Sequence, residues 1–180
     1  MEIKKLAKNA LNFGLNRFIE IIGISIAITG LLLLISLLSY SPEDPNFIFP
    51  ENTNIQNILG FRGSFIADLF YQSFGLIALL IPFSFIFTGS NIFFNKKILL
   101  VIESLFYTIL YSLFGSLFFS NFYINTFKLY INGNGGFVGK YLETTFLNSL
   151  INLNEQISYY VLIVIVTVLF LISVNFRIIP

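Results

Sequence analysis

Four long stretches almost without charge constrain this chain more than any other feature. They cover about residues 21–40, 69–94, 98–119 and 158–176. About 20 apolar residues suffice to cross a hydrocarbon core of about 30 Å. The first stretch has 20 residues and no charge, and the uncharged run that holds the second has 27. With 56% hydrophobic and 11% charged residues, the chain is far less charged than a soluble domain. The sequence therefore predicts an all-α membrane protein with four transmembrane helices in one domain, residues 21–176.

The flanking segments predict how this domain is oriented. Residues 1–20 are basic and show helical spacing of apolar residues, so we expect a short helix at the membrane interface. A secretory signal peptide is the alternative, but the first apolar run is too long and lacks a small-residue cleavage site. Residues 1–20, the turn at 95–97 and the end at 177–180 carry seven cations, against three in the two long loops. The positive-inside rule then places both termini in the cytoplasm and both loops outside.

Small residues recur at helical spacing on the first span. Gly23, Ala27 and Gly30 form one stripe, and such stripes let a second helix approach closely in lipid. We expect helix packing there, including self-association, although ordinary tolerance of glycine in a span would leave the same pattern.

Few polar features interrupt the spans. Asp68 is expected in the first turn of the second span, where the helix dipole favours a carboxylate. Pro82 should kink that span near its middle. Glu103, in the third span, is a functional candidate by its position, or else a partner for Lys96 at the interface.

The first loop, from Ser41 to Arg62, is rich in turn-forming residues. Pro42 and Pro45 exclude a helix interior. Glu43 and Asp44 are expected to be solvated turn residues. The loop is interpreted as a rigid recognition element whose aromatic residues anchor a partner or else sit in the membrane interface; these are Phe47, Phe49 and Phe61.

The second loop, residues 121–156, contains a glycine-rich string at residues 132–139. It is not a phosphate loop, because Tyr141 follows Gly139-Lys140 where a serine or threonine is required. An amphipathic helix on the membrane surface is expected after it. Its apolar face would hold Val138, Leu142, Phe146, Leu150 and Leu153.

No set of residues suggests catalysis, a cofactor or a metal. The chain has neither histidine nor cysteine, which removes the common zinc ligands, thiol nucleophiles and imidazole bases. Its carboxylates are too scattered to form an acid–base pair. The net charge of +1 provides no footprint for nucleic acid, so no direct contact with DNA is expected.

Three elements resemble those of the four-helix membrane domain of the FtsK/SpoIIIE family of DNA translocases. A proline-containing element follows the first span, a glycine-containing element opens the second, and a glycine string precedes the fourth. The first is matched by Ser39, Tyr40, Pro42, Asp44, Pro45 and Asn46, with Ser41 between them. The second is matched by Gly60, Gly63, Ser64, Ile66, Ala67 and Asp68, and the third by Gly135, Gly136, Val138 and Gly139.

The resemblance implies an anchor at the division septum, in the bacterial inner membrane, that meets other membrane proteins of the division machinery. In the family, this domain holds a long linker and a hexameric ATPase that pumps DNA. This sequence shows no Walker motifs, so it is expected to be either part of a longer translocase or a free-standing anchor. A small four-span transport or channel subunit is the alternative, favoured by Glu103, Asp68 and the kink at Pro82.

Overall fold

The computed structural model describes residues 2–45, 54–124 and 131–175, and in them every regular element is helical. The elements are α1 (Glu2–Leu38), α2 (Gly60–Phe74), the 3₁₀ helix η1 (Gly75–Leu80), α3 (Ile81–Asn95), α4 (Leu100–Phe122), α5 (Gly136–Glu143), α6 (Phe146–Leu153) and α7 (Glu155–Ser173). Four helical segments are long and apolar enough to cross a membrane, namely Lys8–Leu38, Gly60–Asn95, Leu100–Phe122 and Glu155–Ser173. The prediction of an all-α membrane protein with four spans is confirmed.

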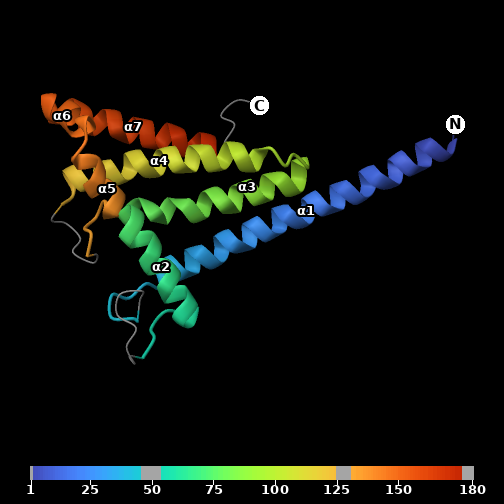
Figure 1. Ribbon diagram of the computed structural model, residues 1–180, viewed down its shortest axis with the longest axis horizontal. Coiled ribbons are helices and arrows are strands. Elements are labelled where there is room, and N and C mark those ends of the chain that lie inside the picture. The colour runs from blue at the N-terminus through green and yellow to red at the C-terminus, as the bar shows by residue number, and fades with distance from the viewer. Residues whose placement is uncertain (1, 46–53, 125–130, 176–180) are drawn as a thin grey trace.

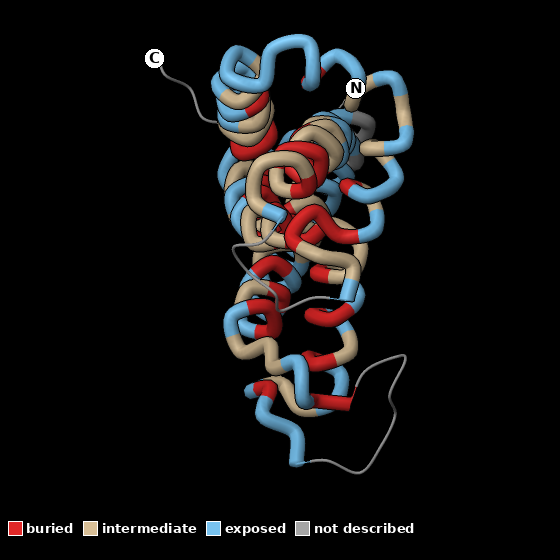
Figure 2. The backbone as a smooth tube through the Cα atoms, turned by 90° about the vertical axis from the view of Figure 1, so that its left-hand side faces the viewer, coloured by how far each residue is buried: buried red, intermediate tan, exposed pale blue. Residues whose placement is uncertain are grey.

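The long helices lie side by side in chain order, α1 against α3, α3 against α4 and α4 against α7 (Figure 1). We call the end at Lys96 and Lys97, between α3 and α4, the turn end. The opposite end, which carries α2, α5 and α6, is the loop end. Buried positions lie mainly where the helices adjoin, and exposed positions lie on their outer sides (Figure 2). Both long loops therefore reach the same end of the bundle.

Helix α1 is longer than the sequence analysis expected. It runs without interruption through 37 residues, and its N-terminal part extends past the other helices (Figure 1). The expected short interfacial helix in residues 1–20 is therefore continuous with the first span. Side chains such as Leu11 and Phe18 are exposed there, because no other helix covers this part of α1.

The second span is broken at Gly75, about two turns before the proline that was expected to kink it. Gly75 adopts a φ of 70°, and η1 follows before α3 resumes regular geometry. Pro82 lies in the first turn of α3, where its missing N–H costs nothing. Proline disturbs the turn that precedes it, so η1 occupies the stretch in which Pro82 forbids a regular α-helix.

The small-residue stripe on α1 packs within the chain. A β-carbon added to Gly23 would lie 2.7 Å from the carbonyl oxygen of Gly89, and one added to Gly89 would lie 2.5 Å from the backbone nitrogen of Ala27. A β-carbon on Gly30 would lie 2.9 Å from the β-carbon of Phe85. The stripe is therefore occupied by α3, and our expectation that it serves self-association is wrong for these residues.

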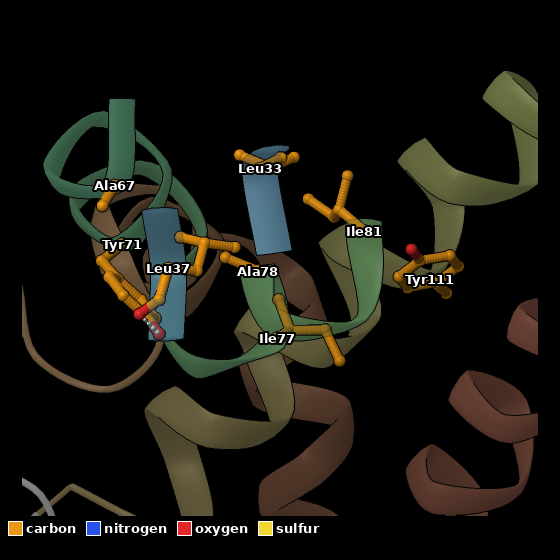
Figure 3. Packing of buried hydrophobic residues seen from close by; sticks show 8 residues of the cluster. All are labelled: Leu33, Leu37, Ala67, Tyr71, Ile77, Ala78, Ile81 and Tyr111. Atoms are coloured by element: carbon orange, nitrogen blue, oxygen red, sulfur yellow. Dashed lines mark hydrogen bonds between the residues drawn. The ribbon is translucent and has the colours of Figure 1, made fainter. Parts of the chain in front are cut away.

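A cluster of buried side chains joins α1, α2, η1, α3 and α4 near the loop end (Figure 3). Its members are Leu33, Leu37, Ala67, Tyr71, Ile77, Ala78, Ile81 and Tyr111. The hydroxyl of Tyr71 donates over 3.1 Å to the carbonyl of Leu37, which also accepts a bond from the backbone N–H of Tyr40 at the end of α1. The cluster fixes α2 onto α1.

The segment before the fourth span forms two short helices rather than one. The side-chain oxygen of Thr145 accepts a bond from the backbone N–H of Leu147 and so starts α6 anew. Ile151 is buried, whereas Phe146, Leu150 and Leu153 are exposed. The helical character of this segment is confirmed, its continuity is wrong, and its position on the membrane surface stays a prediction.

Candidate functional site at the loop end

The carboxylate of Asp44 organises the first loop. It accepts hydrogen bonds from the backbone N–H groups of Gln56 and Asn57, over 2.7 and 2.9 Å. Asp44 is 3% exposed, so the expectation of a solvated turn residue is wrong for it. Glu43 beside it is exposed as expected. Asp44 is buried because it lies at a turn. Its backbone N–H donates to the carbonyl of Ser41, and its side chain faces the later part of the loop, at Gln56 and Asn57.

Asn57 connects the same loop to the end of α1. Its side-chain nitrogen donates to the carbonyls of Ser36 and Ser39, over 2.9 and 3.2 Å. These carbonyls lie in the last turn of α1 and directly after it, where the helix provides no backbone N–H four residues further on. Because Asn57 is 4% exposed, these bonds are shielded from water, and the loop caps the first span.

Asp68 lies within α2 and not in its first turn, because α2 begins eight residues earlier, at Gly60. The hydroxyl of Tyr40 donates to the Asp68 carboxylate over 3.2 Å. Burial, followed by the Asp68 charge, raises the pKa of Tyr40 above its ordinary value. Tyr40 therefore remains a proton donor to Asp68, and the end of α1 is tied to the middle of α2.

The remaining residues of the second element close the same contact. Gly60 adopts a φ of 67° where α2 begins. The carbonyl of Gly63 accepts a bond of 2.6 Å from the hydroxyl of Ser36, and a β-carbon at Gly63 would overlap the side chain of Asn57. Ser64 donates to the carbonyl of Pro45 over 2.8 Å, and Ala67 is fully buried.

The glycine string of the second loop packs between α4 and the junction of α2 with η1. β-Carbons on Gly135 and Gly139 would lie 2.5 and 2.6 Å from the carbonyl oxygen of Ser116 in α4. Gly136 adopts a φ of 64°, and a β-carbon on it would lie 2.5 Å from the backbone nitrogen of Gly75. Only glycine lets the backbones come this close.

Gln72 links the two loops. Its side-chain nitrogen donates to Asp68 over 3.4 Å, and its side-chain oxygen accepts from the backbone N–H of Asn132 over 3.3 Å. The proline-containing, glycine-containing and glycine-string elements, far apart in sequence, thus form one connected structure at the loop end. Of the first element, Asn46 lies outside the described residues, as do Phe47 and Phe49.

Two glycines at the loop end, one at the start of η1 and one in the glycine string, provide a matched pair of substitutions. Gly75 and Gly133 both adopt the left-handed conformation, with φ of 70° and 76°, which costs about 1–2 kcal/mol for other residues. A β-carbon at Gly75 would lie 2.5 Å from the carbonyl carbon of Asn134, whereas nothing lies within 4 Å of one at Gly133. We expect Gly75→Ala to lower the free energy of unfolding by about 2 kcal/mol more than Gly133→Ala. Unfolding both variants in mixed micelles measures the difference, and equal losses would contradict the packing described.

Ionic contacts mark the turn end. Glu20 pairs with Arg17 over 2.5 Å and with Lys96 over 3.1 Å. Lys96 therefore pairs with Glu20 of α1. The pairing of Lys96 with Glu103, one of our two alternatives for Glu103, is not present among the described residues. Glu103 is exposed in the first turn of α4 and forms no ion pair with any described residue. No residue that is charged at neutral pH lies between Glu20 and the end of α1. The first span is therefore apolar from the ionic contact at Glu20, at the turn end, to the bond between Tyr40 and Asp68, at the loop end.

A stripe of hydroxyl side chains along α4 escaped the sequence analysis. Its members, each four residues from the next, are Ser104, Thr108, Ser112, Ser116 and Ser120, and all are buried. Ser116 donates to the carbonyl of Phe74 over 2.9 Å, and Thr88 of α3 donates to Ser104 over 2.5 Å. Residues four apart share one face of a helix, so this spacing was a usable signal that α4 lies at the centre of the bundle.

The chemistry of the loop end is that of a structural joint. Both buried carboxylates, Asp44 and Asp68, are engaged by donors from neighbouring segments. Among the described residues, no three acidic, histidine or cysteine side chains are grouped as a metal site. The arrangement fixes two loops in defined positions at one end of the spans.

Comparison with known proteins identifies the family of the chain. Residues 16–179 match the family described as the 4TM region of DNA translocase FtsK/SpoIIIE. The chain belongs to this family. It matches the family's membrane region, which is distinct from the motor region, and all three elements of the loop end lie inside the matched range. The resemblance predicted from those elements is confirmed.

Three relatives, all named DNA translocase FtsK, share the match. The protein from Rickettsia bellii (strain RML369-C) is 33% identical over 84 residues, 45% of this chain and 11% of that protein. The protein from Rickettsia typhi (strain ATCC VR-144 / Wilmington) is 38% identical over 64 residues, 36% and 9%. The one from Azospirillum brasilense is 31% identical over 81 residues, 44% and 13%. The FtsK-like chain thus spans a small part of these relatives' length. No solved structure matches it.

Proposed function

We propose that this chain is the membrane-anchoring and interaction domain of a septal DNA translocase that acts in cell division and chromosome segregation. The observation that carries the proposal is the match to the FtsK 4TM region over residues 16–179. The relatives are named DNA translocases and are much longer than their aligned parts. ATP-driven DNA pumping would belong to a motor outside this membrane region, and this chain would make no direct contact with nucleic acid.

We further propose that the domain resides in the bacterial inner membrane with both termini in the cytoplasm. The support is the distribution of charge. Lys96 and Lys97 lie at the turn end, toward which the N-terminal part of α1, with its lysines and Arg17, also extends (Figure 1). The loop end would then face outward, away from the motor.

The partners proposed are the lipid bilayer, other copies of the chain and membrane proteins of the division machinery. The first outward loop is suited to recognise a protein because its backbone is held by Asp44 and Asn57. Preorganised loops lose less entropy on binding. On this surface Pro42 is exposed and Ile58 is 77% exposed.

Fluorescence microscopy of the tagged chain in dividing cells of its own species tests this function. We expect wild-type fluorescence at the septum and at least a twofold lower septal fraction for Ile58→Ser. Leu99→Ser is the matched control, because Leu99 is a 72% exposed apolar residue at the turn end. Equal amounts in the membrane fraction exclude poor insertion. Wild-type fluorescence spread evenly over the envelope would refute a septal anchor.

A further inference from the structure

An apolar groove on the side of the bundle has no role in the fold described above. Its larger part, of about 530 Å³, lies between α1, α2 and α3. A smaller part, of about 250 Å³, lies between α1, α3 and α4. Thr29 and Phe85 line both parts, so the two hollows meet. The remaining walls are largely aliphatic and include Leu32, Leu33, Ile66 and Leu69.

The hydroxyl groups along this groove are already satisfied by the protein. Ser25 and Thr29 each donate to the carbonyl four residues earlier in α1, over 2.9 Å. Ser36 donates to the carbonyl of Gly63 over 2.6 Å, and Thr88 donates to Ser104 over 2.5 Å. Since buried polar groups without a partner are costly, an occupant that forms no hydrogen bonds fits this lining. Hydrocarbon is such an occupant.

The size of the groove favours a chain narrower than a helix. From Ser25 to Ser36 it follows α1 for about 16 Å at 1.5 Å per residue, close to the roughly 15 Å that one leaflet contributes to the hydrocarbon core. A helix about 10 Å wide would occupy roughly 1,200 Å³ over that length. The two hollows measure about 530 and 250 Å³. A helix of a second copy would rest across the rim, whereas an acyl chain would enter.

A cation lies at the loop end of the groove. Arg62, near the start of α2, lines the larger hollow, is exposed, and forms no ion pair within the described part of the chain. Guanidinium groups bind phosphate through paired hydrogen bonds. We propose that an anionic phospholipid of the leaflet at the loop end occupies this groove, with its phosphate at Arg62 and one acyl chain along α1.

Spin-labelled lipids test the headgroup part of this proposal. The full chain is reconstituted with labelled phosphatidylglycerol or phosphatidylcholine, and electron paramagnetic resonance measures the motionally restricted fraction. We expect wild-type protein to prefer phosphatidylglycerol by about fivefold, the effect of one cation near a membrane surface. Arg62→Gln should abolish the preference. Lys140→Gln, which removes another loop-end cation outside the groove, should preserve it.

A second substitution tests the acyl-chain part. Thr29→Phe fills the point where the two hollows meet and should release about one restricted lipid per chain, whatever its headgroup. Ile28→Phe is the control, since Ile28 is half exposed and does not line the groove. An unchanged preference in Arg62→Gln together with an unchanged lipid number in Thr29→Phe would overturn the proposal. A lower oligomeric mass for Thr29→Phe than for the wild type, with lipid binding unchanged, would instead assign the groove to a second copy.

Discussion

Replacing Gly89 by leucine is expected to separate α1 from α3 and to lower the free energy of unfolding by about 3 kcal/mol or more. Even the first carbon of the new side chain would lie 2.5 Å from backbone atoms of Gly23 and Ala27. Backbone cannot yield as a flexible side chain can, so the helices must move apart and lose their packing. Because α1 packs against α3 more extensively than any other pair of elements, much of the bundle depends on this crossing.

Gly14→Leu is the matched control for this prediction. Gly14 lies on the same helix as Gly23, and nothing lies within 4 Å of a β-carbon at that position. Reversible unfolding of both variants in mixed micelles gives the two free energies. We expect Gly14→Leu to stay within about 0.5 kcal/mol of the wild type, as surface substitutions usually do. A similar, small loss in both variants would contradict the close crossing.

Removal of the Asp44 carboxylate is expected to release the first loop and to cost about 3 kcal/mol. Asp44→Ala would leave the backbone N–H groups of Gln56 and Asn57 without their acceptor. Each unsatisfied buried group costs about 1–3 kcal/mol. Asn57 would then lose its position against the carbonyls of Ser36 and Ser39, so the cap on α1 would be weakened as well.

Glu43→Ala is the control, because Glu43 is a neighbouring carboxylate that is exposed. Its removal should change the free energy of unfolding by less than about 1 kcal/mol, the usual range for an exposed polar contact. Limited proteolysis of the loop gives a second readout, with faster cleavage expected only for Asp44→Ala. Equal cleavage of the two variants would show that Asp44 does not hold the loop.

The sequence was sufficient to predict the number of spans but not their ends. Uncharged runs of about 20 residues or more admit few alternatives, because each must cross the hydrocarbon core. The predicted span began at residue 69 because the uncharged run begins directly after Asp68, whereas α2 begins at Gly60. Asp68 lies inside the helix, where it is buried and bonded to Tyr40. A buried, paired carboxylate looks the same in sequence as a solvated one.

The packing partners could not be predicted either. The stripe of Gly23, Ala27 and Gly30 indicates a close helix contact, but it does not say whether the other helix belongs to the same chain. Gly89 of α3 contacts the backbone of α1 where the two helices cross. The sequence does not indicate this contact, because it does not give the register between α1 and α3. The three family elements, by contrast, were recognisable in advance, and what required the structure was their union through Asp44, Asp68 and Gln72.

The contacts among the three family elements require both loops to lie on one side of the membrane. Thiol labelling in intact cells tests this requirement directly. The chain contains no cysteine, so Ile58→Cys, Tyr141→Cys and Lys97→Cys each introduce a single label site at an exposed position. We predict that a membrane-impermeant maleimide labels positions 58 and 141 from outside and position 97 only after permeabilisation. Labelling of 58 and 141 from opposite sides, or of 97 from the same side as 58, would contradict the four-span joint described here.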